Sequence, residues 1–319
     1  MLLPLFAVVI LATCLMVNAS AVSAQDYPNK PIRIFTSQSG SPSDFIARLL
    51  AQGISGPLGQ SVIVDNRVGI VATENVAKAP ADGYTLLFYG PVVWLLPYLR
   101  NYVAWDPEKD FSAVTLATQA PNLLVIHPSL PVKSVRELIA LAKARPGELN
   151  YGSGLTGSSN HMAAELFKSM AGVNIVRVPY SGPAAAFTAV IGGQLQLMFP
   201  DAGSASPHVK SGRIRALAIS TAEPSALGPG LPTIAASGVP GYESGIISAM
   251  FAPAKTPAAI INRLNQEIVN VLNKPDVKER LFNSGVEVVG SSPEQLAAKM
   301  RSEMTRMSKV IKEAGIKAE

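Results

Sequence analysis

The sequence is poor in the residues that build thiol and metal sites. Its 319 residues include one cysteine and three histidines. The histidines, His127, His161 and His208, form no HExxH motif and no pair at i, i+4 spacing. A zinc site would therefore have to gather carboxylates from distant segments. We predict neither a metal site nor a cofactor.

Charged residues are also few, at 15% of the chain. The 27 Lys and Arg against 22 Asp and Glu give a net charge of 27 − 22 = +5. Basic and acidic residues are interspersed, as in the stretch 136–143, so no basic patch indicates nucleic acid as a partner. Hydrophobic residues at 48% and a mean hydropathy of +0.26 indicate a folded chain, and the length favours about two domains.

Residues 1–24 contain no charged side chain and carry an apolar run from Leu2 to Val17. The segment ends in small residues before Gln25, which is typical of a signal-peptidase site. We predict a signal peptide cleaved after about Ala24 and a periplasmic mature chain. The run is shorter than the ~20 apolar residues of a bilayer-spanning helix, which favours a cleaved signal over a membrane anchor. An uncleaved anchor and lipidation at Cys14 are the alternatives. Cleavage would remove the only cysteine, which excludes disulfides and thiolate metal sites.

From residue 30 onward, short β-rich runs alternate with amphipathic helical patterns. This alternation predicts α/β layers with at least partly parallel sheets. Helices are expected over 135–144, from 257 through 271, and from 293 nearly to the end, each after a capping or proline signal. The predicted strands are 32–36, 62–64, 85–89, 123–127, 150–152, 175–178, 195–199, 216–220 and 247–252.

One pattern of strand, Gly/Ser loop and helix occurs twice, about 115 residues apart. The first loop, residues 37–44, precedes a helix from Phe45, and the second loop, residues 152–160, precedes a helix from His161. Each loop should end at a helix N-terminus, where free N–H groups and about half a positive charge face outward. Glycine lets a ligand approach the backbone closely, and the hydroxyls of the loops donate hydrogen bonds. The two loops together therefore predict an anion clamp with few basic side chains nearby.

Other chemistries have weaker support. Residues 152–157 match GxGxxG, but no acidic residue follows the strand at 175–178 to hold a ribose. Neither loop has the GxSxG spacing of a serine hydrolase, and no close Asp/Glu pair indicates a glycosidase. We therefore predict that the protein is not an enzyme. The alternative is an exported hydrolase, with His161 and Asp201 as the plausible bases near the loops.

Several candidate residues have two readings. Asp201 follows the strand at 195–199 and either lies beside the ligand crevice or caps the next helix. His161 either points into a cleft as a hydrogen-bond donor or packs against its own loop. Tyr89 and Tyr180 lie near predicted strand ends, where a tyrosine closes over a ligand or fills a domain interface.

A series of motifs resembles the extracytoplasmic solute receptors of the tripartite tricarboxylate transporters, the Bug family. They run in order along the mature chain: YPNKPIR at 27–33, VDNR at 64–67, AKAPADGYTL at 77–86, LNYGS at 149–153, HMAAELF at 161–167, VPYSG at 178–182 and LPTIAASG at 231–238. The resemblance implies a type II periplasmic binding protein with two α/β lobes around a central ligand cleft. We place lobe 1 at 25–123 and 248–319, and lobe 2 at 124–247.

The same resemblance implies a receptor that captures a small organic acid, a carboxylate, and delivers it to membrane permease subunits. A sensor-partner role is the alternative, and we expect a monomer. The second loop matches the family's ligand-facing pattern, whereas the first has Ser in place of most glycines and the segment after Arg67 is shortened. An aromatic acid, a monocarboxylate or an uncharged polar solute therefore stays possible. The predicted ligand-binding residues are Ser37, Gln38, Ser39, Ser41, Asp44, Tyr89, Gly90, Ser153, Gly154, Thr156, Gly157, Ser158, His161, Tyr180 and Asp201.

Overall fold

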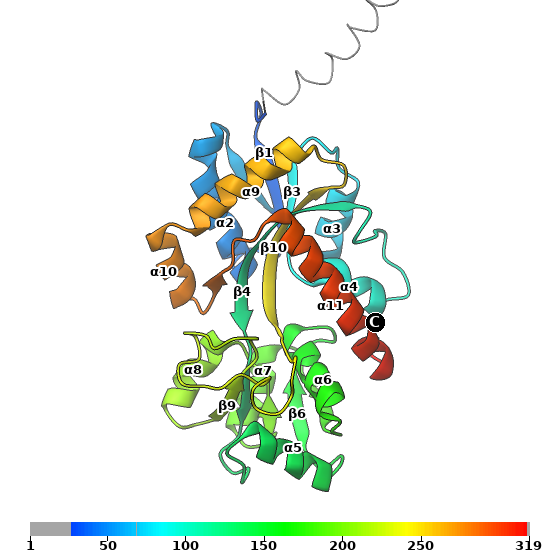
Figure 1. The fold of residues 1–319 in the computed structure, drawn as a ribbon, viewed down its shortest axis with the longest axis vertical. Helices are drawn as coiled ribbons and strands as arrows, with labels where there is room; N and C mark the ends of the chain where they lie inside the picture. Colours follow the sequence, from blue (N-terminus) through cyan, green and yellow to red (C-terminus); the bar gives the residue numbers. More distant parts are fainter. Residues whose placement is uncertain (1–26, 68, 318–319) are drawn as a thin grey trace, which may run out of the picture.

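The computed structural model describes residues 27–67 and 69–317 and has two lobes, one above the other in Figure 1. The predicted signal peptide, residues 1–24, lies outside the described residues, as does Cys14. Within the described ranges, no helix is both long enough and apolar enough to cross a membrane.

The first lobe is built on a sheet of six described strands in the order β11-β4-β10-β3-β1-β2. β1, β2 and β3 are parallel, and β10 is antiparallel to both β3 and β4, so β4 runs in the same direction as β1. The strands are β1 (Ile32–Thr36), β2 (Val62–Asn66), β3 (Thr85–Tyr89), β4 (Phe111–Pro121), β10 (Gly245–Pro253) and β11 (Glu287–Val288).

Helices cover both faces of this sheet, as continuous apolar strands require. Ile34 and Leu86 pack in the core that contains α2 (Pro42–Leu58) and α9 (Ala258–Leu272). Their neighbours Phe35 and Leu87 point to the other face, toward α4 and α11. The remaining bounds are α3 (Gly69–Ala77), α4 (Val92–Leu99), α10 (Pro275–Asn283) and α11 (Pro293–Glu313).

The second lobe has five described strands in the order β7-β6-β8-β5-β9. Its core divides in the same way: Tyr151 lies with α5 and α6, and Met198 lies with α7 and α8. The elements are β5 (Leu123–Ile126), α5 (Val135–Ala144), β6 (Asn150–Ser153), α6 (Ser159–Ala171), β7 (Val176–Pro179), α7 (Pro183–Ile191), β8 (Leu197–Met198), α8 (Ala202–Lys210) and β9 (Arg215–Ile219).

Two long paired strands connect the lobes. β4 leads through Asn122 directly into β5, and the chain returns to the first sheet along β10, which pairs with β4 from Gly245 to Pro253. Figure 1 shows both strands extending between the two lobes. The first sheet is therefore assembled from two separate parts of the chain. The lobe boundaries at 123/124 and 247/248 stay a prediction.

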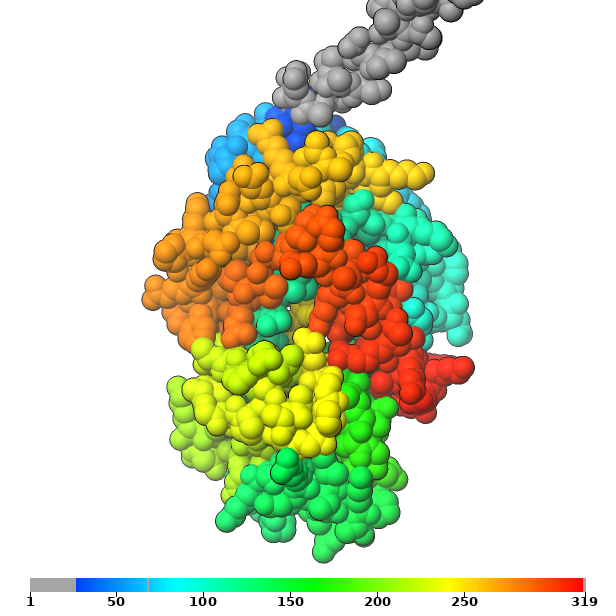
Figure 2. All heavy atoms as spheres, in the orientation of Figure 1, coloured from blue at the N-terminus to red at the C-terminus, as the bar shows by residue number. Residues whose placement is uncertain are grey.

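Helix α11 also reaches both lobes. It begins at a capping box, in which Ser292 and Gln295 bond reciprocally, and packs on β4 in the first lobe. Its C-terminal part lies against α6 in the second lobe, and Figures 1 and 2 show it across the front of the junction.

Every predicted strand is present, but β4 and β11 were not predicted. The sequence of β4, FSAVTLATQAP, mixes hydroxyls with apolar residues, yet Thr115 and Thr118 are fully buried. The hydroxyl of Thr115 donates to the Ser291 carbonyl oxygen at 2.8 Å, and the Ser291 hydroxyl accepts from the Leu116 N–H at 2.9 Å. These partners lie 175 residues or more away in the chain, so the local pattern does not indicate a buried strand.

Candidate functional site

Strand direction brings the two loops to facing edges of the two sheets. β1 and β3 run parallel to β4, which leads toward the second lobe, so their C-terminal ends point to it. In the second lobe β8 is antiparallel to β5, and β6 is parallel to β8. The C-terminal end of β6 therefore points back to the first lobe. The first and second loops follow β1 and β6 at these ends.

The first loop is closed on itself by Asp44, which is 4% exposed. The Asp44 carboxylate accepts from the Gly40 N–H at 2.9 Å and from the Asn66 amide at 2.7 Å, and it pairs with Arg48 at 3.0 Å. The Asp44 oxygens are therefore occupied by partners inside the protein, and its contact with a ligand stays a prediction. Burial alone would raise the pKa of Asp44, but the bonds from Arg48, Asn66 and Gly40 outweigh burial and lower it.

The N-terminus of α2 offers few free amides. Its N-cap Ser41 accepts from the Asp44 N–H, and Pro42 has no N–H at all. The expectation of an open amide-lined end is therefore wrong for this helix. Among the predicted ligand residues, Gln38 and Ser39 are exposed, while the hydroxyls of Ser37 and Ser41 lie 2.5 Å apart and bond to each other.

Tyr89 and Gly90 lie beside the first loop, at the end of β3. The Tyr89 hydroxyl donates to the Arg67 carbonyl oxygen at 3.2 Å. Gly90 lies against the crossing strand β10, where a Cβ would come within 2.3 Å of the Ile247 carbonyl oxygen. Glycine is thus required at 90 for the close approach of two backbones.

The second loop is held by Arg177, which comes from β7. Its Nε donates to the Ser153 hydroxyl at 2.7 Å, its Nη1 to the Thr156 hydroxyl at 3.1 Å, and its Nη2 to the Gly154 carbonyl oxygen at 3.0 Å. A half-buried guanidinium, which was not among the predicted site residues, therefore underlies the loop. Sequence reasoning missed Arg177 because it lies 24 residues after Ser153 in the chain.

His161 packs against its own loop, the second of its two predicted readings. It is 2% exposed, and its Nδ1 accepts from the Gly157 N–H at 3.0 Å. Burial, with smaller contributions from Arg177 and Lys168, lowers the pKa of His161 to about 3. The ring is therefore neutral near pH 7, and its proton lies on Nε2 because Nδ1 is an acceptor.

The N-terminus of α6 is open. Its N-cap Ser158 makes no side-chain capping bond to the helix and instead donates to Asn160 Oδ1 at 2.8 Å. Across the described residues, the backbone N–H groups of 159–161 have no hydrogen-bond partner. These are the donors that a helix presents to an anion.

The last two predicted residues have structural contacts. Tyr180 packs with Val178 on the core of the second lobe, and its N–H donates to the Ser153 carbonyl oxygen at 2.9 Å. Asp201 is the N-cap of α8, with its two carboxylate oxygens accepting from the Ser204 N–H and hydroxyl at 2.7 Å each. The capping reading of Asp201 is therefore confirmed.

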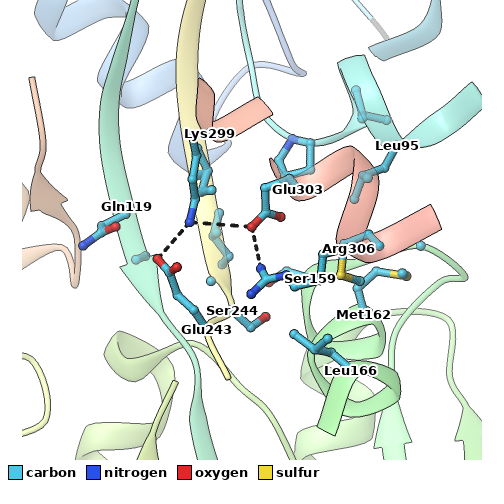
Figure 3. Close-up of a pocket in the computed structure, with 18 of the residues that line it drawn as sticks. Leu95, Gln119, Ser159, Met162, Leu166, Glu243, Ser244, Lys299, Glu303 and Arg306 are labelled. Atoms are coloured by element: carbon cyan, nitrogen blue, oxygen red, sulfur yellow. Dashed lines mark hydrogen bonds and ion pairs between the residues drawn. The ribbon is translucent and has the colours of Figure 1, made fainter. Parts of the chain in front are cut away.

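A cavity of ≈180 Å³ lies at the junction of the lobes (Figure 3). It is bounded by α4, α6, α11 and the crossing strands, and of the predicted ligand residues Thr156 and Gly157 line it. Much of its wall is apolar: Leu95, Leu96, Leu99, Met162, Leu166, Ile247 and Met307.

Four paired charges form the polar side of this cavity. Lys299 of α11 lies 2.9 Å from Glu243 and 3.6 Å from Glu303, and Arg306 pairs with Glu303 at 2.5 Å. Two cations balance two carboxylates, so the cavity carries no excess positive charge for an anion. In the part of the chain that the structure describes, no three His, Cys, Asp or Glu side chains are grouped so that they could hold a metal.

Two α/β lobes on crossing strands, with facing loops at their junction, define the class of two-lobed binding proteins. Residues 46–316 match the family model described as the tripartite tricarboxylate transporter family receptor, and the chain belongs to this family. It is 33% identical over 318 residues to the UPF0065 protein encoded between tcbD and tcbE in Pseudomonas sp. (strain P51), covering 97% of this chain and 95% of that one. It is also 33% identical to the protein BugT of Bordetella pertussis, covering 94% of each.

Solved structures agree with this assignment. Rpa4515 of R. palustris, solved with adipate, is 37% identical with a TM-score of 0.74 and covers 92% of this chain and 100% of that one. MatC from Rhodopseudomonas palustris, solved with bound malate, is 29% identical with a TM-score of 0.70 and covers 89% of this chain and 100% of that one. The predicted fold and the predicted family are both confirmed.

Proposed function

We propose that this protein is a periplasmic receptor that binds a small organic carboxylate between its lobes and delivers it to the membrane subunits of a tripartite tricarboxylate-type transporter. The observation that carries the proposal is the second loop, where the free N–H groups of 159–161 lie at a helix N-terminus above a guanidinium. The adipate and malate bound to the two solved relatives support a carboxylate as the ligand class.

The second loop is the expected anchor of the carboxylate. A carboxylate accepts from the N–H groups at the start of α6 and is stabilised by the helix dipole. Arg177 adds a full positive charge beneath the loop while holding Ser153, Gly154 and Thr156 in place. Water exclusion on closure of the lobes strengthens each of these interactions.

The first loop is expected to contact the other end of the ligand. Its exposed residues Gln38 and Ser39 offer neutral donors and acceptors, and the occupied carboxylate of Asp44 leaves no net positive charge there. A ligand that touches both loops favours the closed form, because it gains contacts with both lobes only when they are together. We infer a ligand with one carboxylate at the second loop and an uncharged polar group at the first.

The contacts of His161 and Asp201 favour a receptor over an exported hydrolase. These were the two plausible bases, but Nδ1 of His161 is occupied by the Gly157 N–H and both oxygens of Asp201 are bonded to Ser204. Neither base is free to activate a nucleophile. Export through the segment 1–24 and a monomeric state complete the proposal.

Isothermal titration calorimetry of the purified protein against adipate, malate, short monocarboxylates and aromatic acids tests this function. At least one acid should bind, and its binding should raise Tm as ligand concentration exceeds Kd. Absence of binding by the whole panel would overturn the carboxylate receptor. Hydrolysis of model esters that is lost in Ser158→Ala would instead favour the exported hydrolase.

A further inference from the structure

A second cavity lies behind the second loop, between the second lobe and the chain after α11. Its volume is ≈320 Å³, and it is lined by Thr156, His161, Glu165, Lys168, Arg177 and residues 314–317. Residues 314–317 belong to none of the elements that position the first loop. The cavity is therefore separate from the proposed contact between the two loops, although Thr156, His161 and Arg177 belong to both.

The lining of this cavity is cationic. Lys168, Arg177 and Lys317 against Glu165 give 3 − 1 = +2. Glu165 is already satisfied, since it accepts from the Tyr151 hydroxyl at 2.5 Å and from Lys168 at 2.8 and 3.0 Å. Its charge is thus matched by Lys168, and the positive charges of Arg177 and Lys317 remain in excess.

Hydrogen-bond donors also remain in excess. An arginine has five N–H donors, and Arg177 uses one from each of three nitrogens for the second loop, which leaves 5 − 3 = 2. His161 lines the same cavity and, with Nδ1 accepting from Gly157, carries a donating N–H on Nε2. The residues that carry these donors come from β7, α6 and the end of the chain, and all of them line the same cavity.

We propose that this cavity binds a tetrahedral oxyanion of the size of phosphate, distinct from the organic acid that the proposed function places between the loops. Several oxygens in a tetrahedral arrangement match donors that converge from separate elements, whereas one planar carboxylate satisfies fewer of them. Because Arg177 contacts both this cavity and the second loop, an oxyanion here lowers the affinity of the organic acid several-fold. By linkage, the organic acid lowers the affinity of the oxyanion by the same factor.

Calorimetric titration of the purified protein with inorganic phosphate at low ionic strength tests the cavity, with acetate as a planar comparison. Phosphate should bind more tightly than acetate, and Lys168→Met and Lys317→Gln should each weaken it by about tenfold. The matched control is Lys312→Gln, which removes another exposed cation, at the end of α11 and outside the cavity, and should change phosphate affinity by less than about twofold.

Lys317 is exposed, so Lys317→Gln should fold normally. It therefore tests the cavity even if Lys168→Met impairs folding. Unchanged phosphate affinity in Lys317→Gln, or absence of phosphate binding, overturns the proposal. Complete mutual displacement of phosphate and organic acid also overturns it, because one shared site would explain that result. Phosphate binding that depends on Lys317, in a protein that binds no organic acid, would support this cavity while contradicting the proposed function.

Discussion

The first and second loops have the same backbone arrangement but differ in the charge of one side chain. Each contains a glycine with positive φ, Gly40 at 79° and Gly157 at 82°, followed by a serine N-cap. In each, the third residue of the helix reaches back to the N–H of that glycine, at 2.9 Å for Asp44 and 3.0 Å for His161. The side chain that makes this bond is a carboxylate in one loop and a neutral imidazole in the other.

A helix N-terminus alone does not make an anion site. Asp44 places a negative charge where the α2 dipole would attract an anion, while His161 makes the same bond without charge. Arg177 then adds a positive charge beneath the second loop.

Placing a carboxylate at position 161 of the second loop should have the largest effect on the affinity for the organic acid. His161→Asp reproduces the Asp44 arrangement at α6 and places a negative charge beside the N–H groups of 159–161, so the affinity for the organic acid should fall by about 100-fold. His161→Asn, which keeps a neutral acceptor, is the control and should bind within a few-fold of the wild type. Equal affinities of the two variants in calorimetry would contradict the comparison.

Removing the guanidinium should have the next largest effect. Arg177→Met leaves Ser153 and Thr156 without their donor and should weaken the organic acid by roughly 30-fold through lost charge and a less ordered loop. Arg67→Met is the control beside the first loop, where Arg67 pairs with Asp65 at 3.1 Å. If both variants bind alike, the second loop has no special role in anchoring the ligand.

The buried His161 should also make stability depend on pH. The unfolded chain protonates this residue near pH 6.5, but the folded chain does so only near pH 3. The unfolded state therefore binds more protons in this window, and the free energy of unfolding falls as the pH drops, by up to about 1.4 kcal/mol per pH unit. The free energy of unfolding, measured with urea between pH 6.5 and 4.5, should depend less steeply on pH in His161→Asn than in the wild type. Identical slopes would mean that His161 is protonated in the folded state.

Neutralising the first loop should have the smallest effect on binding. Asp44→Asn keeps the shape of the side chain and removes the negative charge, so dicarboxylates should bind about threefold more tightly while monocarboxylates change little. Because the pKa of Asp44 is lowered in the folded protein, the ionised carboxylate stabilises the fold above pH ~3.8. This stabilisation is lost as the pH falls through the pKa of Asp44 in the folded protein, and the loss should be absent in Asp44→Asn. A weaker dicarboxylate affinity would show instead that Asp44 supports binding.

Local signals predicted much of the fold. The strands at 32–36 and 85–89 and the helix over 135–144 have the bounds expected from sequence, because short apolar runs and the Ser134 N-cap determine them locally. β4 was missed because its buried threonines depend on Ser291, a partner distant in the chain. Likewise Arg177 was missed because parallel pairing of β6 and β7 brings it beneath the second loop.

The contrast between Asp44 and His161 did have a signal in the sequence. Gly40-Ser41 and Gly157-Ser158 are each followed, after two further residues, by the side chain that bonds back to the glycine. Alignment of the two loops on these serines would have paired Asp44 with His161. The occupied state of the Asp44 carboxylate depends also on Asn66 of β2, which only the fold brings near.

Helix α11 starts on the first lobe and ends against α6 of the second. If the lobes separate on ligand release, bending of β4 and β10 would have to be accompanied by sliding of α6 along α11. Such a helix–helix shear permits small displacements before side chains must repack. Under the proposed function, the surface of this C-terminal helix would limit that motion, and substitutions there should alter the rate of ligand release without touching the ligand.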